Sequence, residues 1–157
     1  MKILLLMIGK TDEAYLEQGI EKYAARLKHY ANFELKAIPD IKNRKTLTEE
    51  QQKKAEAELI ASNFQNGDTV VLLDEKGKSL NSTQFASSLN KIMLSGCKRA
   101  VFVIGGPYGF DNDVYNRAND KISLSPMTFS HQMVRLVFVE QLYRAFTIMK
   151  GEPYHHE

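Results

Sequence analysis

Runs of apolar residues constrain the fold of this 157-residue chain more than any other feature of its sequence. Three near-continuous runs cover Lys2–Ile8, Thr69–Leu73 and Ala100–Ile104, and Phe33–Ile38 is a fourth run of similar length. Strands with one wet face alternate apolar and polar residues, whereas strands covered on both faces do not. The runs therefore predict an α/β fold, with a mostly parallel sheet and helices on both faces.

Helical patterns separate these runs. In residues 12–30, apolar side chains recur three and four positions apart and trace one helix face. Thr46–Glu49 has the spacing of a capping box, which predicts a second helix from there to about Phe64. Either Asn81 or Ser82 is suited to cap a third helix.

A short fifth strand, Lys121–Leu124, and a long helix from about His131 to Met149 follow a loop-rich stretch. We expect one doubly wound domain over residues 1–157. The single cysteine excludes a disulfide within the chain. A net charge of +2 and 43% hydrophobic residues argue against disorder and against a strongly basic nucleic-acid binder.

No targeting or membrane segment is expected. The apolar run near the start is short, and Gly9 and Lys10 follow it without a cleavage site. No run approaches the length of a membrane span, about 18 residues. The expected location is the cytoplasm.

Candidate ligand segments follow three of the strands, where open α/β sheets bind ligands. The loop Gly105–Gly109 lets the backbone bend and approach a ligand, but it is neither a Walker loop nor G-x-G-x-x-G, and an ordinary turn fits it as well. Asp74 and Glu75 suit a ribose or a cation, although a plain turn is favoured. The hydroxyl-rich segment Ser123–His131 either clasps an adenine edge with its main chain or caps the last helix.

The last helix carries a cation among apolar residues. Arg135 lies beside Val139 and Leu142, with His131 one turn earlier on the same side. Such a cation is costly unless it is paired or binds an anion, and both interpretations stay open. The helix is more apolar than one face requires, which favours a dimer interface.

The C-terminal tail and a basic loop are the remaining candidates. Tyr154 and His155 suit stacking on and hydrogen bonding to a flipped base, or they are frayed ends. The loop containing Lys42, Arg44 and Lys45 is either part of a basic patch or a solvated loop, and its role stays open. No metal is expected, because the chain's histidines and its one cysteine lack the spacing of zinc ligands.

Five motifs occur in order along the whole chain and together are similar to one family. They are Leu72-Leu73-Asp74-x-x-Gly77-Lys78, Ile104-Gly105-Gly106-Pro107-x-Gly109, Ser123-Leu124-Ser125-x-x-Thr128-x-x-His131-x-x-Val134-Arg135, Glu140-Gln141-Leu142-Tyr143-Arg144-Ala145 and Pro153-Tyr154-His155. This combination resembles the RlmH family of SPOUT methyltransferases.

The resemblance implies a SPOUT-type α/β fold with a C-terminal trefoil knot, which general topology rules would not predict. It implies a homodimer that uses S-adenosylmethionine to methylate N3 of pseudouridine 1915 in helix 69 of bacterial 23S ribosomal RNA. We expect the assembled ribosome, rather than isolated RNA, to be the substrate. The alternatives are a SPOUT methyltransferase acting on transfer RNA and a non-catalytic ribosome-binding module; a nucleotide-dependent reductase is disfavoured by the missing G-x-G-x-x-G.

The resemblance also implies site residues. The positions that would bind the cofactor are Leu73, Gly105, Leu124, Ser125, Pro126, Met127, Thr128 and Phe129. The family's loop often has Glu where this chain has Tyr108, which leaves the cofactor assignment intact because the expected contacts are mainly with the main chain.

Four residues are the hypothesised catalytic group. Methyl transfer needs the methyl carbon held in line with the attacking nitrogen, and the imide that loses its proton needs a nearby cation. Arg135, with His131 or His155, is expected near that nitrogen, and Tyr154 is expected to orient the base. No single general base is assigned.

Overall fold

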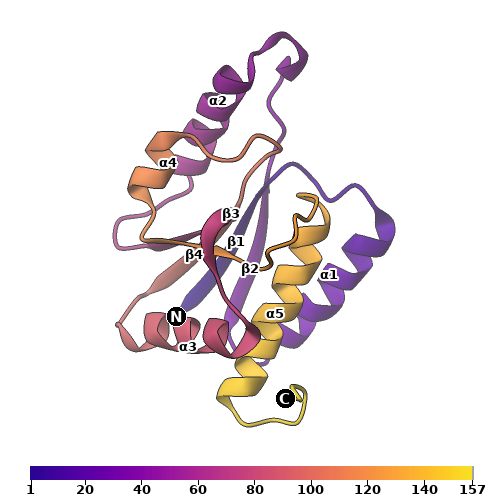
Figure 1. Cartoon of the computed structure of the whole chain (residues 1–157), viewed down its shortest axis with the longest axis vertical. Helices are drawn as coiled ribbons and strands as arrows, with labels where there is room; N and C mark the ends of the chain where they lie inside the picture. Colours follow the sequence, from indigo (N-terminus) through magenta and orange to yellow (C-terminus); the bar gives the residue numbers. More distant parts are fainter. Residues whose placement is uncertain (157) are drawn as a thin grey trace.

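A five-stranded parallel sheet forms the centre of the computed structural model, which describes residues 1–156 (Figure 1). Its strand order is β2-β1-β4-β3-β5, and every paired strand runs in the same direction. The strands are β1 (Lys2–Ile8), β2 (Asn32–Ile38), β3 (Thr69–Ser79), β4 (Arg99–Ile104) and β5 (Asp120–Ser123). The expected parallel α/β architecture is confirmed.

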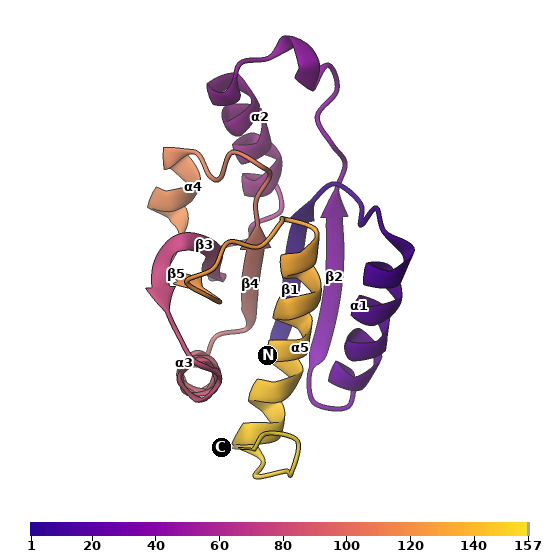
Figure 2. The ribbon, with the colours of Figure 1, turned by 45° about the vertical axis from the view of Figure 1, so that its right-hand side comes forward.

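Within residues 1–156 the chain also forms five α-helices and one 3-10 helix, the last of which, α5, follows the final strand. They are α1 (Ala14–Leu27), η1 (Arg44–Thr46), α2 (Glu49–Ala61), α3 (Ser82–Leu94), α4 (Asn112–Arg117) and α5 (Met133–Met149). Helices α1, α3 and α5 cover one face of the sheet, and α2 and α4 cover the other (Figure 2).

Strand β1 shows why its sequence lacks alternation. Ile3 and Leu5 point into the core that contains α1, α3 and α5, whereas Leu4 and Leu6 point into the core that contains α2 and α4. Each of these side chains is at most 3% exposed. A strand buried on both faces therefore needs apolar residues at every position.

Helix α2 begins two residues later than the sequence predicts. The capping box is formed by Thr48 and Gln51: the Gln51 N–H donates to Thr48 Oγ1 at 3.1 Å, and the Thr48 N–H donates to Gln51 Oε1 at 3.0 Å. Glutamine at the third helical position serves as well as glutamate. Thr46 cannot serve as the cap because it lies in η1, where its hydroxyl donates to the Asn43 carbonyl. The cap of α3 is Asn81 rather than Ser82.

Strand β3 runs six residues further than the apolar run that predicted it. Its first half pairs with β4 and β5, and after an interruption at residues 74–77 Lys78 and Ser79 pair with β5 again. Gly77 makes this interruption possible, because a Cβ there would lie 2.6 Å from the backbone of Ile122. The interruption places Asp74 and Glu75 at the carboxyl edge of the sheet.

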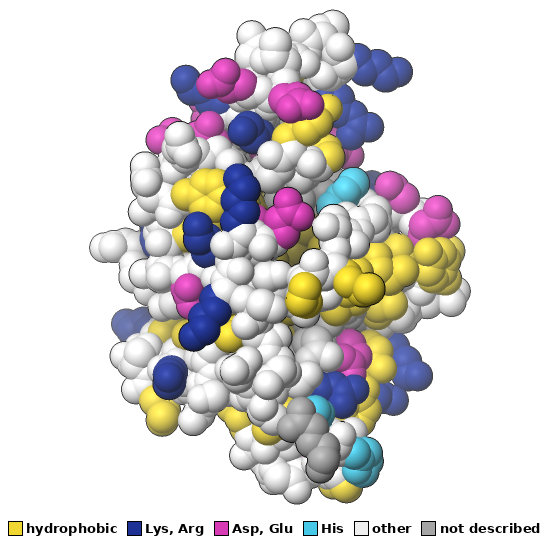
Figure 3. Space-filling model, in the orientation of Figure 1, with side chains coloured by type: hydrophobic (Ala, Val, Ile, Leu, Met, Phe, Trp, Pro, Cys, Tyr) yellow, Lys and Arg dark blue, Asp and Glu magenta, His cyan; other side chains and the backbone are white. Residues whose placement is uncertain are grey.

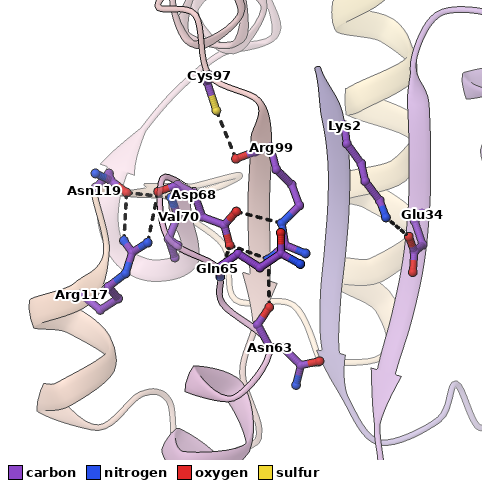
Figure 4. A network of polar contacts seen from close by, with 10 residues as sticks. All are labelled: Lys2, Glu34, Asn63, Gln65, Asp68, Val70, Cys97, Arg99, Arg117 and Asn119. Atoms are coloured by element: carbon purple, nitrogen blue, oxygen red, sulfur yellow. Dashed lines mark hydrogen bonds and ion pairs between the residues drawn. The ribbon is translucent and has the colours of Figure 1, made fainter.

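An ion pair fixes the opposite, amino-terminal edge of the sheet (Figure 4). Asp68, just before β3, accepts hydrogen bonds from Arg99 Nε at 2.8 Å and from the Gln65 N–H at 2.7 Å. Burial alone would raise the pKa of Asp68, but these hydrogen bonds outweigh it and the pKa is lowered. Arg117, at the end of α4, donates a hydrogen bond to the backbone carbonyl of Asp68. Asp68 therefore links the start of β3 to both β4 and α4. The helix α4 itself was not predicted, because six residues are too few to show a periodic pattern.

Candidate functional site

A cavity of about 370 Å³ opens at the carboxyl ends of β3, β4 and β5, where Leu73, Ile104 and Ile122 lie at its base. Figure 3 shows a hollow near the centre of this face, with acidic and histidine side chains at its rim. The volume lies within the range usual for small-molecule sites, about 300–1,000 Å³.

Three loops that are far apart in sequence form the walls of this cavity: residues 74–75, 105–110 and 123–131. These are the same three segments that the sequence analysis singled out. The cavity is lined by all of the expected cofactor-binding residues except Pro126, namely Leu73, Gly105, Leu124, Ser125, Met127, Thr128 and Phe129. His131 lines it as well.

The hydroxyl groups of the loop between β5 and α5 mainly bind the loop itself. Ser123 Oγ donates to the Ser125 carbonyl at 2.8 Å, and Ser125 Oγ accepts from the Met127 N–H at 2.9 Å. Ser130 Oγ accepts from the Met133 N–H in the first turn of α5. Ser130 thus satisfies the first N–H of α5, although the residue directly before the helix is Gln132, whose side chain makes no capping bond. The rest of the loop forms a wall of the cavity.

The glycine-rich loop after β4 is a tight turn. The Gly109 N–H donates to the Gly106 carbonyl at 3.2 Å, and Gly109 has a φ of +80°, which glycine adopts without strain. A Cβ at Gly105 would lie 3.0 Å from the Phe110 ring. This loop is therefore more than an ordinary turn, because its backbone forms one side of the cavity.

Two carboxylates lie at the cavity, although the sequence interpretation favoured a plain turn for both. Asp74 Oδ2 accepts a hydrogen bond from the Tyr115 hydroxyl, and burial together with this bond raises the pKa of Tyr115. Thr128 Oγ1 donates to Glu75 Oε2 at 3.4 Å, which links the walls after β3 and β5. In the sequence, the feature that points to Asp74 and Glu75 as site residues is their position directly after the apolar half of β3.

Arg135 is fully buried, with an exposed fraction of 0%. Its guanidinium donates to the carbonyls of Ile8 (2.6 Å), Gly9 (3.0 Å) and His131 (3.2 Å), and to Thr11 Oγ1 (3.1 Å). Burial lowers its pKa. Three carbonyl oxygens and one hydroxyl accept the hydrogen bonds of this cation, and no carboxylate does so within the described residues. In the single chain Arg135 is therefore neither part of an ion pair nor accessible to a bound substrate.

The C-terminal tail folds back onto α1 and α5. The Tyr154 hydroxyl donates to Glu140 Oε1 at 3.0 Å and lies 3.3 Å from the Tyr23 hydroxyl. Arg144 binds Glu140 at 2.7 Å and lies 3.2 Å from His155 Nδ1. The tail residues are thus held by side chains rather than frayed.

The four hypothesised catalytic residues are not brought together within one chain. His131 precedes the N-terminus of α5, and Tyr154 and His155 follow its C-terminus. A helix of 17 residues spans about 25 Å. The cavity lies at the N-terminal end of α5, and the tail folds back from the other end only as far as Glu140, near the middle of the helix. Figure 1 shows the C-terminus beside the C-terminal end of α5.

Within residues 1–156 no group of three or more His, Cys, Asp or Glu side chains is arranged to hold a metal ion. No helix in this part of the chain is long and apolar enough to cross a membrane.

Comparison with known proteins identifies the family. Residues 1–155 match the family described as "Predicted SPOUT methyltransferase". The chain belongs to the SPOUT methyltransferase family. The resemblance inferred from the five motifs is thereby confirmed over nearly the whole chain.

Curated relatives within the SPOUT family are similar over their full length. A protein of Christiangramia forsetii is 61% identical over 156 residues, which is 99% of each chain. A protein of Parabacteroides distasonis is 59% identical over 157 residues, and one of Flavobacterium johnsoniae is 56% identical, each with complete coverage of both chains. All three are named "Ribosomal RNA large subunit methyltransferase H".

Proposed function

We propose that this SPOUT protein is a ribosomal RNA methyltransferase that acts in the cytoplasm on N3 of pseudouridine 1915, in helix 69 of 23S RNA. The observation that carries the proposal is the full-length identity of 61% and 59% to proteins named large-subunit methyltransferase H. The cavity at the carboxyl edge of the sheet is the site where we place the reaction.

The cavity fits S-adenosylmethionine as the methyl donor. Leu73, Ile104 and Leu124 give it apolar walls suited to an adenine ring, and the loop 124–129 adds main-chain polar groups for the ring's edge. Asp74 and Glu75 suit the positive charges of the sulfonium and the amino group. When bound, this cofactor would supply an activated methyl group with a good leaving group.

The chain's own residues would then position the target base and stabilise its charge. His131 is exposed and lines the cavity, where its imidazole would meet an RNA base. Arg135 holds the backbone of His131 through the His131 carbonyl, so its contribution from within the same chain would be to orient His131. A cation near the deprotonated imide nitrogen would lower the barrier by stabilising negative charge.

A homodimer would complete this site. In the single chain the tail is bonded to Glu140, near the middle of α5, and does not line its own cavity. We infer that the tail of a second copy approaches the cavity instead. Met133, Leu136 and Val137 on α5 are only partly covered within one chain, and Figure 3 shows a band of hydrophobic side chains beside the hollow. In this arrangement Tyr154 and His155 of one subunit would face the cavity of the other. The family's trefoil knot would provide the cavity's C-terminal wall.

Recognition of RNA would rest on few charges. Lys42, Arg44 and Lys45 are exposed in the segment before α2, and Arg44 Nη1 lies 3.5 Å from Asp40 Oδ1. With a net charge of +2 per chain, we expect weak and salt-sensitive binding to isolated RNA, and productive binding to the assembled ribosome.

The test is mass-spectrometric mapping of large-subunit RNA before and after incubation with protein and S-adenosylmethionine. The expected result is one methyl group on pseudouridine 1915 in intact ribosomes. Methylation of transfer RNA instead would identify the rival SPOUT activity, and ribosome binding without methylation would identify a binding module. Arg135→Ala and His155→Ala variants that fold and keep near-normal turnover would refute their assignment to the site.

A further inference from the structure

Helix α2 carries a buried carboxyl group that the proposed reaction does not use. Glu56 is only 3% exposed. One of its oxygens, Oε2, lies 3.4 Å from Gln52 Nε2, and the other, Oε1, has no hydrogen-bond partner among residues 1–156. Leaving a buried polar group unpaired is costly, so its position calls for a physical reason.

The carboxyl group of Glu56 packs against Gly106 in the glycine-rich loop. A Cβ built on Gly106 would lie 2.8 Å from Glu56 Oε1 and 2.9 Å from its Cδ, and its three nearest atoms all belong to Glu56. Gly106 does not have a positive φ, so its backbone conformation is open to other residues. The Glu56 carboxyl group therefore occupies the space that a side chain at position 106 would need.

Glu56 does not line the cavity, whereas Gly106 and both of its neighbours do. Any effect of Glu56 on a ligand must accordingly pass through the loop. The pKa of Glu56 is raised, mainly because the group is buried. The negative charge of Asp40 raises it further, whereas the hydrogen bond from Gln52 and the positive charge of Arg44 lower it in part. A carboxyl group that keeps its proton can donate as well as accept a hydrogen bond, without the cost of a buried charge.

We propose that Glu56 is a positioning residue of the methyl-donor cavity: its buried carboxyl group packs on Gly106 and fixes the wall formed by residues 105–110. This inference rests on the proposed function only in taking S-adenosylmethionine as the ligand of the cavity. It assigns a role to α2, which the family motifs quoted above do not include.

Calorimetric binding of S-adenosylmethionine tests this role. We expect Glu56→Ala to weaken binding, with a rise of about tenfold in Kd. Glu56→Gln, which keeps the shape and hydrogen-bonding capacity, should stay within about threefold of the unaltered protein. Glu58→Ala is the matched control, because Glu58 is exposed on the same helix two residues away.

A double-mutant cycle separates positioning from general destabilisation. Gly106→Ala alone should weaken binding, because the new methyl group displaces the Glu56 carboxyl group and shifts the loop. In Gly106→Ala with Glu56→Ala the methyl group enters the vacated space, so the double variant should bind more tightly than Gly106→Ala alone. If Glu56→Ala does not fold, Glu56→Asp takes its place in the cycle, since it withdraws the carboxyl group by one methylene.

Steady-state kinetics gives a second measurement. Loss of positioning should raise the KM for S-adenosylmethionine more than it lowers kcat, and Glu56→Gln should restore the KM. Unchanged binding in Glu56→Ala and Gly106→Ala, or strictly additive losses in the double variant, would overturn the role of Glu56. Failure of the unaltered protein to bind S-adenosylmethionine would instead refute the cofactor in the proposed function.

Discussion

The guanidinium of Arg135 donates to the carbonyl of Ile8 at 2.6 Å, joining the start of α5 to the end of β1 across 127 residues of sequence. The same side chain holds the carbonyls of Gly9 and His131. These contacts place His131, and with it one edge of the cavity, at a fixed position relative to the sheet. Arg135 is thus a link between the core and the candidate site.

Replacing Arg135 by lysine should therefore affect stability as well as activity. Lysine keeps the charge but cannot reach several carbonyls in different directions, so buried acceptors lose their donors. We expect the free energy of unfolding to fall by about 2 kcal/mol, as for loss of one or two buried hydrogen bonds. Urea denaturation measures this loss, with Arg44→Lys at an exposed position before α2 as the control. A variant of unchanged stability with strongly reduced methyl transfer would show instead that Arg135 acts directly on the substrate.

Acid should weaken the amino-terminal edge of the sheet through Asp68. Its pKa is lowered in the folded state, so its contribution to stability is complete above the ordinary value of about 3.9 and is lost as the pH falls through the lower folded value. Asp68→Asn should remove this dependence and, by leaving the partly buried Arg99 without its carboxylate, cost about 3 kcal/mol at neutral pH.

Urea denaturation from pH 7 to pH 2 measures both effects. The exposed pair of Lys2 and Glu34 provides the control, because Glu34→Gln should change stability by less than about 1 kcal/mol. An Asp68→Asn variant as stable as the unaltered protein at pH 7 would contradict the assigned role of the ion pair.

Gly77→Ala should disturb the cavity through the backbone. A Cβ at this position meets the backbone of Ile122, which cannot move aside as a side chain can. We expect a loss of about 2 kcal/mol in stability, within the usual range for overpacking. We also expect weaker binding of S-adenosylmethionine, because β5 forms the base of the cavity. Lys76→Ala, at an exposed neighbouring position, should change neither the denaturation midpoint nor the binding isotherm.

The sequence predicts the sheet well because its signals are local. Apolar runs such as Lys2–Ile8 depend only on burial of both faces, and the structure places this strand at the predicted residues. The second half of β3 carries no such signal, because none of residues 74–79 is apolar apart from Gly77, and of these residues Lys78 and Ser79 pair with the short edge strand β5. Strand pairing across 40 or more residues depends on tertiary contacts that no local pattern records.

The sequence predicts the loops of the candidate site but not the contacts that hold them in place. Its three loops were found because each follows a strand end, and that rule comes from topology. The apolar-face position of Arg135 was predicted from helical periodicity, but its carbonyl partners lie in β1 and were not foreseeable from α5 alone. Glu56 was missed altogether, since a glutamate within a polar helix gives no sign that it is buried against a distant glycine.

The tail should be sensitive to loss of a single hydroxyl. Tyr154 bonds to Glu140 and Tyr23, and burial together with these bonds raises its pKa. Tyr154→Phe keeps the ring against Tyr143 but removes the bonds, so we expect a loss of about 1 kcal/mol in stability and a larger proportional loss of methyl transfer. Tyr15→Phe, on the exposed face of α1, is the matched control.

Mixing two inactive variants tests whether the tail of one subunit completes the cavity of the other. Gly105→Val should block the cavity, because its side chain would enter the space between the loop and the Phe110 ring. His155→Ala should disable the tail while leaving the cavity intact. If the site is composite, unfolding and refolding an equal mixture should restore about a quarter of the unaltered activity, since half of the dimers are mixed and each has one complete site. Each variant refolded alone serves as the control, with circular dichroism to verify folding. No recovery in mixed dimers that are shown to form would mean that the cavity and tail of the same chain act together, and the composite arrangement would be wrong.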